Sequence, residues 1–181
     1  MMDAANYAEN VVLKNGLAVQ IRAVRADDKG RISEAFRNLE AESIYTRFFH
    51  HKKALSEAEL KAATEVDFDA VVALVVTTEE AGTETIIAAS RFVAFDTPDG
   101  RRSAEVAFTV EEDYHGQGIA THLLRHLVTI AREKGIAQFE ADVLPQTGAM
   151  LAVFSRGGLP MTQHREPGSV HVVLSLTEAS G

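Results

Sequence analysis

The stretch that decides the fold runs from Ser103 to Gly135 and reads SAEVAFTVEEDYHGQGIATHLLRHLVTIAREKG. Its first eight residues are mostly apolar and predict a strand that ends at Val110. A loop with two glycines, HGQG at 115–118, then opens into the apolar spacing of an amphipathic helix. The first N–H groups of a helix have no partner inside it and carry the positive end of its dipole, and glycine lets a ligand come close to the backbone. Strand, glycine loop and helix start therefore predict an anion site suited to a phosphate.

The sequence of this loop does not match two common nucleotide-binding motifs. The Rossmann pattern G-x-G-x-x-G needs a third glycine where Thr121 stands, and the Walker pattern needs a Gly-Lys-Ser/Thr that is absent. What remains resembles the pyrophosphate loop of the GNAT family of N-acetyltransferases, written Q/R-x-x-G-x-G/A. The departure is His115, where that family usually has Gln or Arg. Backbone amides carry most of the phosphate binding in the family, so we expect this change to be tolerated.

Length and composition bound the remaining possibilities. The 181 residues suit one domain, which we place at 19–176, between an N-terminal extension at 1–18 and a C-terminal tail at 177–181. With no cysteine, the chain has no disulfide, thiolate metal site or cysteine nucleophile, and we expect no metal. Its scattered basic residues and net charge of −8 argue against a nucleic-acid partner. The acidity fits a cationic partner such as an amine, although solubility alone also accounts for it.

No membrane association is expected either. No apolar run approaches the ~18 residues of a membrane span, and the N-terminus MMDAANYAEN has no signal-peptide pattern. These features predict a cytoplasmic protein.

The remaining periodicity supplies the order of elements. Strands are predicted at 19–24, 71–78, 85–95, 103–110, 137–144, 161–164 and 169–176, and helices at 27–39, 41–49, 56–64, 118–134 and 148–156. Apart from the short third helix at 56–64, the order is β-α-α-β-β-β-α-β-α-β-β, which resembles that of the acetyltransferase fold. We therefore expect a mixed α+β fold with a central, mostly antiparallel, twisted sheet of about seven strands flanked by helices.

A closer resemblance extends over roughly residues 19–176. The segments IRAVRADD, SIYTRFF, VDFDAVVALV, AEVAFTV and ADVLPQTGAML resemble the acetyltransferase domain of bacterial protein lysine acetyltransferases. This resemblance implies acetyl-CoA as cosubstrate, direct attack by an amine, and a protein lysine as acceptor. In those proteins the domain is usually joined to an acyl-CoA-synthetase-like or cyclic-nucleotide-binding module. Because only about fifteen residues precede the first predicted strand, we expect no such module in this chain.

The resemblance also implies which residues hold the cofactor. Backbone of the 108–110 segment would pair with the pantetheine amides, and amides of the glycine loop would bind the pyrophosphate. The implied cofactor-binding residues are Phe108, Thr109, Val110, His115, Gly116, Gln117, Gly118, Ile119, Ala120, Thr121, Thr147 and Phe154. Core packing is the alternative for Phe108 and Val110, and both roles are compatible.

A tyrosine that protonates the leaving thiolate in some family members is missing here. The motif N-x6-Y-x3-G-F becomes Thr147-x6-Phe154-x3-Gly158-Leu159 in this chain. Phe154 has no proton to give, but a thiol with a pKa near 8.5 leaves readily as the thiolate. The departure puts tyrosine-assisted chemistry in doubt and leaves acyl transfer possible.

Glu105 is the candidate general base. A free lysine has a pKa near 10.4, so deprotonating it at pH 7 costs roughly 4 to 5 kcal/mol. Glu105 is the only charge in the apolar run 104–110, and burial there would raise its pKa toward a useful range. It also stands where the protein lysine acetyltransferases carry their base. The alternative is an outward-facing strand residue in a salt bridge with Arg91.

Other functions remain open at this stage. The chain can be a small-molecule amine acetyltransferase, or a CoA-sensing module without catalysis, which would not need Glu105; a homodimer is also compatible with the sequence. His122 and His126 lie one helical turn apart, but no third metal ligand is evident, so we interpret them as part of a polar helix face.

Overall fold

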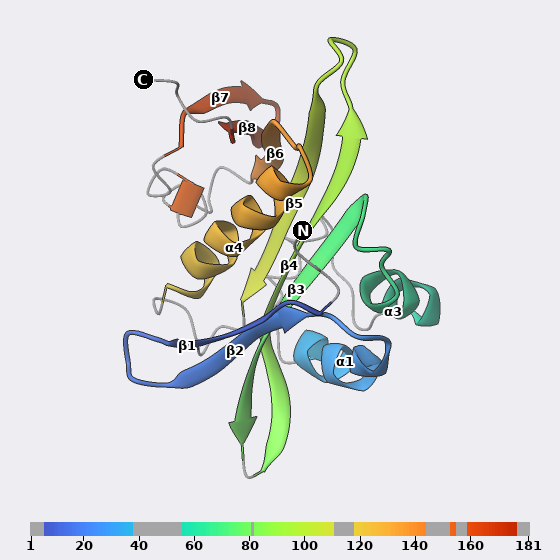
Figure 1. Cartoon of the computed structure of the whole chain (residues 1–181), viewed down its shortest axis with the longest axis vertical. Coiled ribbons are helices and arrows are strands. Elements are labelled where there is room, and N and C mark those ends of the chain that lie inside the picture. The colour runs from blue at the N-terminus through green and yellow to red at the C-terminus, as the bar shows by residue number, and fades with distance from the viewer. Residues whose placement is uncertain are drawn as a thin grey trace.

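The computed structural model describes residues 6–37, 56–80, 82–110, 118–143, 153–154 and 159–176. The strands are β1 (Ala8–Val12), β2 (Ala18–Ala23), β3 (Val71–Glu80), β4 (Thr83–Asp96), β5 (Arg102–Val110), β6 (Gln138–Val143), β7 (Met161–Glu166) and β8 (Ser169–Ser175). The helices are α1 (Lys29–Arg37), α3 (Glu57–Thr64) and α4 (Ile119–Glu133). The strands form one eight-stranded sheet in the order β1-β2-β3-β4-β5-β6-β8-β7, and helices lie on both of its faces (Figure 1). Among the strand pairs of the described residues, only β5–β6 is parallel.

The mixed, mostly antiparallel fold expected from the sequence is confirmed. The additional strand is β1, which lies in the segment predicted to be an N-terminal extension and pairs with β2 from Ala8↔Arg22 to Val12↔Ala18. Four of its five residues are exposed, so it lacks the apolar alternation that reveals a strand in a sequence. The predicted helix at 41–49 and most of the one at 148–156 lie outside the described residues, although 153–154 are helical.

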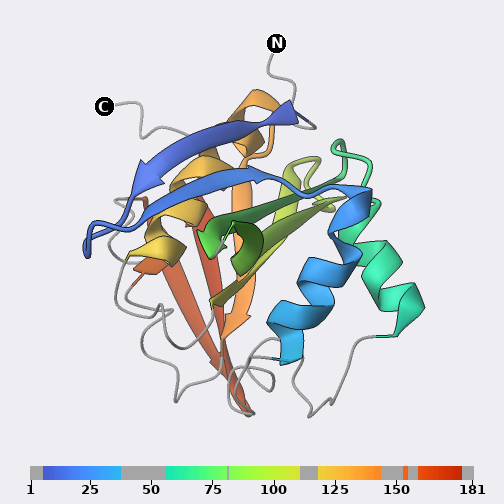
Figure 2. The ribbon, with the colours of Figure 1, turned by 90° about the horizontal axis from the view of Figure 1, so that it is seen from below.

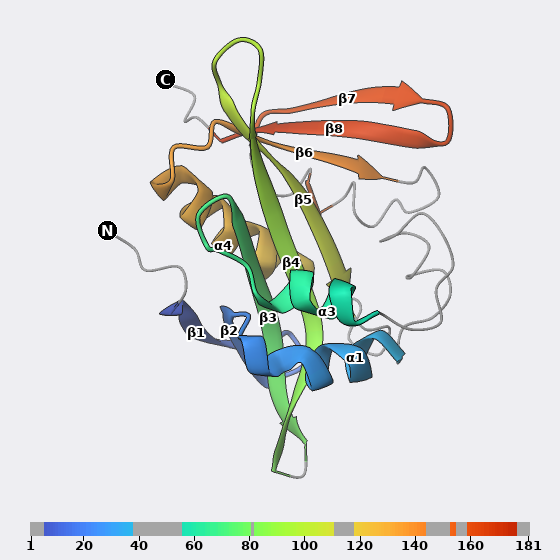
Figure 3. The same cartoon turned by 90° about the vertical axis from the view of Figure 1, so that its right-hand side faces the viewer.

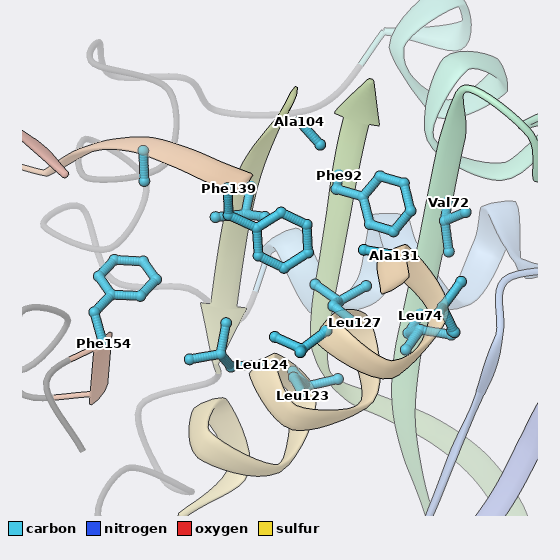
Figure 4. Close-up of a cluster of buried hydrophobic side chains, with 14 of the residues drawn as sticks. Val72, Leu74, Phe92, Ala104, Leu123, Leu124, Leu127, Ala131, Phe139 and Phe154 are labelled. Atoms are coloured by element: carbon cyan, nitrogen blue, oxygen red, sulfur yellow. The ribbon is translucent and has the colours of Figure 1, made fainter. Parts of the chain in front are cut away.

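Helix α4 covers one face of the sheet and forms the main core with it. Its apolar stripe, which includes Leu123, Leu127 and Ala131, packs on strand residues such as Phe92 and Phe139, all of them almost fully buried (Figure 4). The pattern predicted for this helix is therefore confirmed. On β5, Ala104 and Val106 face α4 in the same cluster.

Helices α1 and α3 lie on the opposite face, as Figures 2 and 3 show. A smaller buried cluster there joins Val24, Ala73, Val75 and Ile86 to Ile32 and its neighbours on α1. A capping box begins α3, at the start of the helix predicted over 56–64: the Glu59 N–H donates to Ser56 Oγ at 3.2 Å, and the Ser56 N–H donates to Glu59 Oε1 at 3.1 Å.

A buried ion pair fixes the start of α1 to the sheet. Asp28 is fully buried and accepts hydrogen bonds from the Arg22 guanidinium at 2.8 Å twice, from the Arg25 N–H at 2.7 Å and from Arg31 at 2.9 Å. Burial alone raises the pKa of the Asp28 carboxyl, but these hydrogen bonds outweigh it and leave the pKa below its ordinary 3.8. Arg22 is itself buried and also binds Glu84 at 2.9 Å.

We expect Asp28→Asn to lower the free energy of unfolding by about 3 kcal/mol, because it leaves the buried Arg22 charge with one carboxylate partner. Urea denaturation at pH 7 measures this. Since folding depresses the Asp28 pKa, its contribution is complete above the unfolded-state pKa and disappears as the pH falls through the lower folded-state value. Asp27→Asn is the control, because its side chain is 71% exposed and its ion pairs are solvated. Equal stability of the two variants would contradict the assignment.

Candidate active site

A fork between β5 and β6 is the central feature of the site. The two strands pair at only three positions, Ser103↔Gln138, Ala104↔Phe139 and Glu105↔Glu140. Beyond Glu105, β5 continues to Val110 paired with β4, whereas β6 runs away from it and pairs with β8 (Figure 3). Within the described residues, the edge of β5 that faces β6 is therefore unpaired over 106–110. An extended chain that carries amides can add to such an edge as a further strand.

The start of α4 lies beyond the end of β5. Gly118 is the N-cap residue and has a φ of +83°, a left-handed conformation that favours glycine. The first intrahelical bond is donated by the His122 N–H to the Gly118 carbonyl at 3.0 Å, so the N–H groups of Ile119, Ala120 and Thr121 precede the helical ladder. Ile119 buries its side chain in the core, while Ala120 and Thr121 are half-buried. The geometry is that of a helix start able to receive an anion.

A lysine from the N-terminal hairpin reaches this helix start. A Cβ atom added to Gly118 would lie 3.6 Å from Lys14 Cε. Lys14 follows β1 and its side chain is exposed. The hairpin therefore adds a cation to the site, which the sequence analysis did not predict.

Several predicted cofactor-binding residues cannot be placed. His115, Gly116, Gln117 and Thr147 lie outside the described residues, and the side chains of Thr109 and Val110 are likewise outside the description, although both residues belong to β5. Their roles stay predictions.

Phe108 and Phe154 come together beside the fork. Their ring centroids are 6.0 Å apart with an edge-to-face angle of 64°. Phe154 is 1% exposed and belongs to the main core cluster, against which Phe108 packs (Figure 4 labels Phe154). Both side chains therefore belong to the core, which was the alternative considered for Phe108. The backbone of Phe108 still lies on the stretch of β5 that is paired with β4 but unpaired on its edge toward β6.

Glu105 lies at the last pairing position of the fork. The prediction that it is buried is wrong, because its side chain is exposed. Its neighbours Ala104 and Val106 turn toward α4, so Glu105 points to the other face, and the apolar run around it reflects alternation rather than burial on both sides. The alternative salt bridge with Arg91 is also absent among the described residues. Glu105 is thus an accessible carboxylate at the point where the strands separate.

A charged cluster next to Glu105 was missed by the sequence analysis. The His171 ring on β8 bonds Glu140 Oε1 through Nε2 at 2.8 Å and Asp142 Oδ1 through Nδ1 at 2.9 Å. The hydrogen bond to Asp142, and then the one to Glu140, raise the pKa of His171 against the opposing effect of partial burial. The alternation of acidic and apolar residues in QFEADV was a visible signal, but it does not reveal which strand lies beside β6.

The two histidines of α4, His122 and His126, are both partly buried. His126 Nδ1 contacts the Tyr7 hydroxyl and lies 3.6 Å from Glu9 Oε2, so it joins the N-terminal strand to α4. Burial lowers the pKa of both His126 and His122.

In the described part of the chain, no group of three or more histidine or acidic side chains is arranged to hold a metal ion. Of the described helices, none is long and apolar enough to cross a membrane.

Comparisons with known proteins agree with this geometry. The model of the acetyltransferase (GNAT) family matches residues 34–158. The acetyltransferase Pat of Mycolicibacterium smegmatis is 33% identical over 150 residues, which are 82% of this chain and 43% of Pat. An acetyltransferase of Pseudomonas aeruginosa is 31% identical over 126 residues, which are 70% of this chain and 66% of the relative. The chain thus spans less than two thirds of the length of both relatives.

Solved structures give the same result. The crystal structure of the GNAT domain of PAT from S. lividans superposes with a TM-score of 0.82 at 33% identity, covering 93% of this chain and 96% of that one. A putative acetyltransferase from Salmonella typhimurium, solved with its cofactor acetyl-CoA, shares the fold with a TM-score of 0.69 at 18% identity, covering 90% and 96%. These findings confirm the resemblance to the acetyltransferase domain of the bacterial Pat enzymes. The chain belongs to the acetyltransferase (GNAT) family, whose members are acetyl-CoA-dependent N-acyltransferases.

Proposed function

We propose that this protein transfers the acetyl group of acetyl-CoA to the side-chain amine of a protein lysine. The observation that carries the proposal is the exposed carboxylate of Glu105 at the end of the β5–β6 pairing, directly beside the unpaired edge of β5. The reaction needs a base next to the thioester, and the fork places the Glu105 carboxylate beside the strand edge that would hold acetyl-CoA. The similarity to Pat and to the GNAT domain of PAT supports a protein acceptor.

The protein groups divide the work of holding the cosubstrate. The unpaired edge of β5 over 106–110 offers backbone donors and acceptors to the pantetheine amides. The N–H groups at the start of α4, with the adjacent loop, take the pyrophosphate, and Lys14 adds positive charge there. Acetyl-CoA supplies the activated acetyl thioester.

The chemical step then needs a base and a donor. Glu105 binds the incoming ammonium and accepts its proton, directly or through water, which frees the nitrogen lone pair for attack on the thioester carbonyl. The N–H of Thr109 or a neighbour is our candidate donor to the carbonyl oxygen as its charge grows. No acid is assigned to the leaving group, because the thiolate is stable enough to leave and Phe154 has no proton.

The surroundings of Glu105 favour a large acceptor. On the same face of the sheet, the β4 residues Val93 and Phe95 are 38% and 40% exposed, and Val93 is the register partner of Glu105. An apolar surface next to an accessible carboxylate suits a lysine presented on a folded protein better than a small amine that needs enclosure. A CoA sensor without catalysis has no use for the carboxylate at this point.

An acceptor screen tests the proposal. The full chain is incubated with acetyl-CoA and one of three acceptors: a protein with an accessible lysine such as acetyl-CoA synthetase, lysine peptides, or small amines. Thiol release and mass spectrometry follow the reaction. We expect acetyl-lysine on a protein acceptor together with one equivalent of CoA. Turnover of small amines alone would favour the small-molecule alternative, and acetyl-CoA binding without turnover of any amine would favour the sensor.

A further inference from the structure

Lys14 lies against the residue that begins α4. Its Cε atom is 3.6 Å from the position that a Cβ atom on Gly118 would occupy, so the stem of the lysine passes close to the N-cap residue. The ammonium is one bond further along the side chain, within reach of a ligand bound to the N–H groups of 119–121. Figures 1 and 2 both show the turn between β1 and β2 beside the start of α4.

The hairpin that carries Lys14 is fixed to α4 at two points. Next to the lysine, Leu13 is buried in the same apolar cluster as Ile119 of α4. The N–H and the carbonyl of Leu13 each form a backbone hydrogen bond of 2.9 Å within the turn. At the other end of β1, the Tyr7 hydroxyl contacts the His126 ring on α4. The position of Lys14 relative to the helix start is therefore set by the fold.

The start of α4 has no negative group to balance its charge. Its first turn contains no acidic residue, and Gly118 provides no side-chain cap. Anions stabilise helix N-termini and cations stabilise C-termini, so Lys14 stands at the unfavourable end of this helix. Within the described residues, no carboxylate forms an ion pair with Lys14. A bound anion would stabilise both the lysine and the helix start.

The titratable and charged groups on α4 itself do not take this place. Burial, and then the charge of Arg125, lower the pKa of His122 below its ordinary 6.5, so its ring is largely neutral at pH 7. Arg125 lies about 10 Å further along the helix axis than Gly118. Lys14 is thus the cation that the described part of the chain brings to the N-cap residue.

Resting on the placement of acetyl-CoA in the proposed function, we propose that Lys14 binds the pyrophosphate of acetyl-CoA directly and makes the β1–β2 hairpin part of the cosubstrate site. The N–H groups at the helix start bind one side of the pyrophosphate, and the ammonium binds another. The 3′-phosphate of CoA is separated from the pyrophosphate by the ribose and is not the group that Lys14 contacts. The hairpin thereby favours thioesters that carry the pyrophosphate over the same acyl group on pantetheine.

Three ligands separate the phosphates. CoA carries the pyrophosphate and the 3′-phosphate, dephospho-CoA keeps only the pyrophosphate, and pantetheine carries neither. Calorimetry on the full chain without an acceptor gives the affinities for the first two, and ligand-observed NMR gives that for pantetheine. We expect Lys14→Met to weaken CoA and dephospho-CoA by the same factor, about 5–10-fold, and to leave pantetheine unchanged. Lys14→Arg should keep most of the affinity because it keeps the charge.

Lys61→Met is the matched control. It removes an exposed lysine from α3, on the opposite face of the sheet from α4, and changes the net charge by the same amount. All three affinities should stay in place in this variant. A loss confined to CoA in Lys14→Met would assign the lysine to the 3′-phosphate and overturn the proposal. Unchanged affinity for CoA would also overturn it, and equal weakening of all three ligands would show a structural role instead.

The ligand-free protein gives an independent measurement. Removing a cation from an unbalanced helix start should leave the melting temperature of Lys14→Met unchanged or slightly raised. A lower melting temperature would indicate a structural lysine and contradict the proposal. None of these measurements uses an amine, so a failure to acetylate any acceptor would reject the proposed function and leave them unaffected. An active acetyltransferase whose Lys14→Met variant binds CoA as the wild type does would reject the role of the hairpin alone.

Discussion

Glu105→Gln should lower kcat for amine acetylation by about 10²–10⁴-fold near pH 7, the usual contribution of a general base. Glutamine keeps the shape and hydrogen-bonding capacity of the side chain but cannot accept the proton. Acetyl-CoA affinity should barely change, because the backbone of β5 and the start of α4 hold the cosubstrate. Steady-state kinetics with an acceptor identified by the screen, together with calorimetry, measures both quantities.

The pH dependence separates a base from a structural residue. Raising the pH should partly rescue Glu105→Gln, since more of the amine is then neutral without help. Glu79→Gln is the control, because Glu79 is an exposed carboxylate on β3 of the same sheet, away from the fork. A kcat near that of the wild type across the pH range would make Glu105 structural. The base would then have to be sought among Glu111, Glu112 and Asp113, which lie outside the described residues, or in a water chain.

Exposure changes the reason for expecting this effect. The sequence suggested that burial prepares Glu105 as a base, but in the structure the side chain is open on the face away from α4. Its contribution must therefore arise from position at the fork and from covering by the bound acceptor, which removes water from the carboxylate. Activity should accordingly be lower with acceptors too small to cover Val93 and Phe95 than with acceptors that cover both side chains.

Most helices, strands and turns were predictable because the sequence pattern that indicates each one lies within a short run of residues. The apolar stripe of α4, the capping box at Ser56 and the turn at Pro167-Gly168 need only neighbouring residues. Strand β1 was not predicted, because an exposed edge strand has no buried face. Its pairing with β2 depends on a hairpin rather than on hydrophobicity.

The arrangement of the site was less predictable because it depends on pairing between distant segments. Glu105 and Glu140 become neighbours only because β5 and β6, which α4 connects, pair in parallel. His171 joins them only because β8 lies beside β6. Alternation places each side chain on a face, but it does not say which strands are adjacent. The glycine loop could be recognised locally, whereas the approach of Lys14 to Gly118 required the folded hairpin.

Gly118→Glu should weaken acetyl-CoA binding by on the order of 10²–10³-fold. A carboxylate within about 5 Å of a phosphate charge costs roughly 3 kcal/mol at the effective dielectric of a protein surface, which corresponds to that loss. The substitution also strains the backbone, because Gly118 has a φ of +83°. Gly118→Gln carries the same strain and nearly the same bulk without the charge, so the difference between the two variants isolates electrostatics. Calorimetry on folded protein, verified by circular dichroism, gives both affinities.

Lys14 decides how this result is interpreted. A side chain at position 118 starts toward Lys14, whose Cε lies 3.6 Å from the added Cβ, so a glutamate there can pair with the lysine and remove its charge from the site. In a Lys14→Met background that pairing is impossible. If the phosphates lie at the helix start, Gly118→Glu should still bind far more weakly than Gly118→Gln in this background, and Lys14→Met alone should cost a smaller factor that shrinks with added salt. Equal affinities of the glutamate and glutamine variants in both backgrounds would mean that the pyrophosphate binds elsewhere.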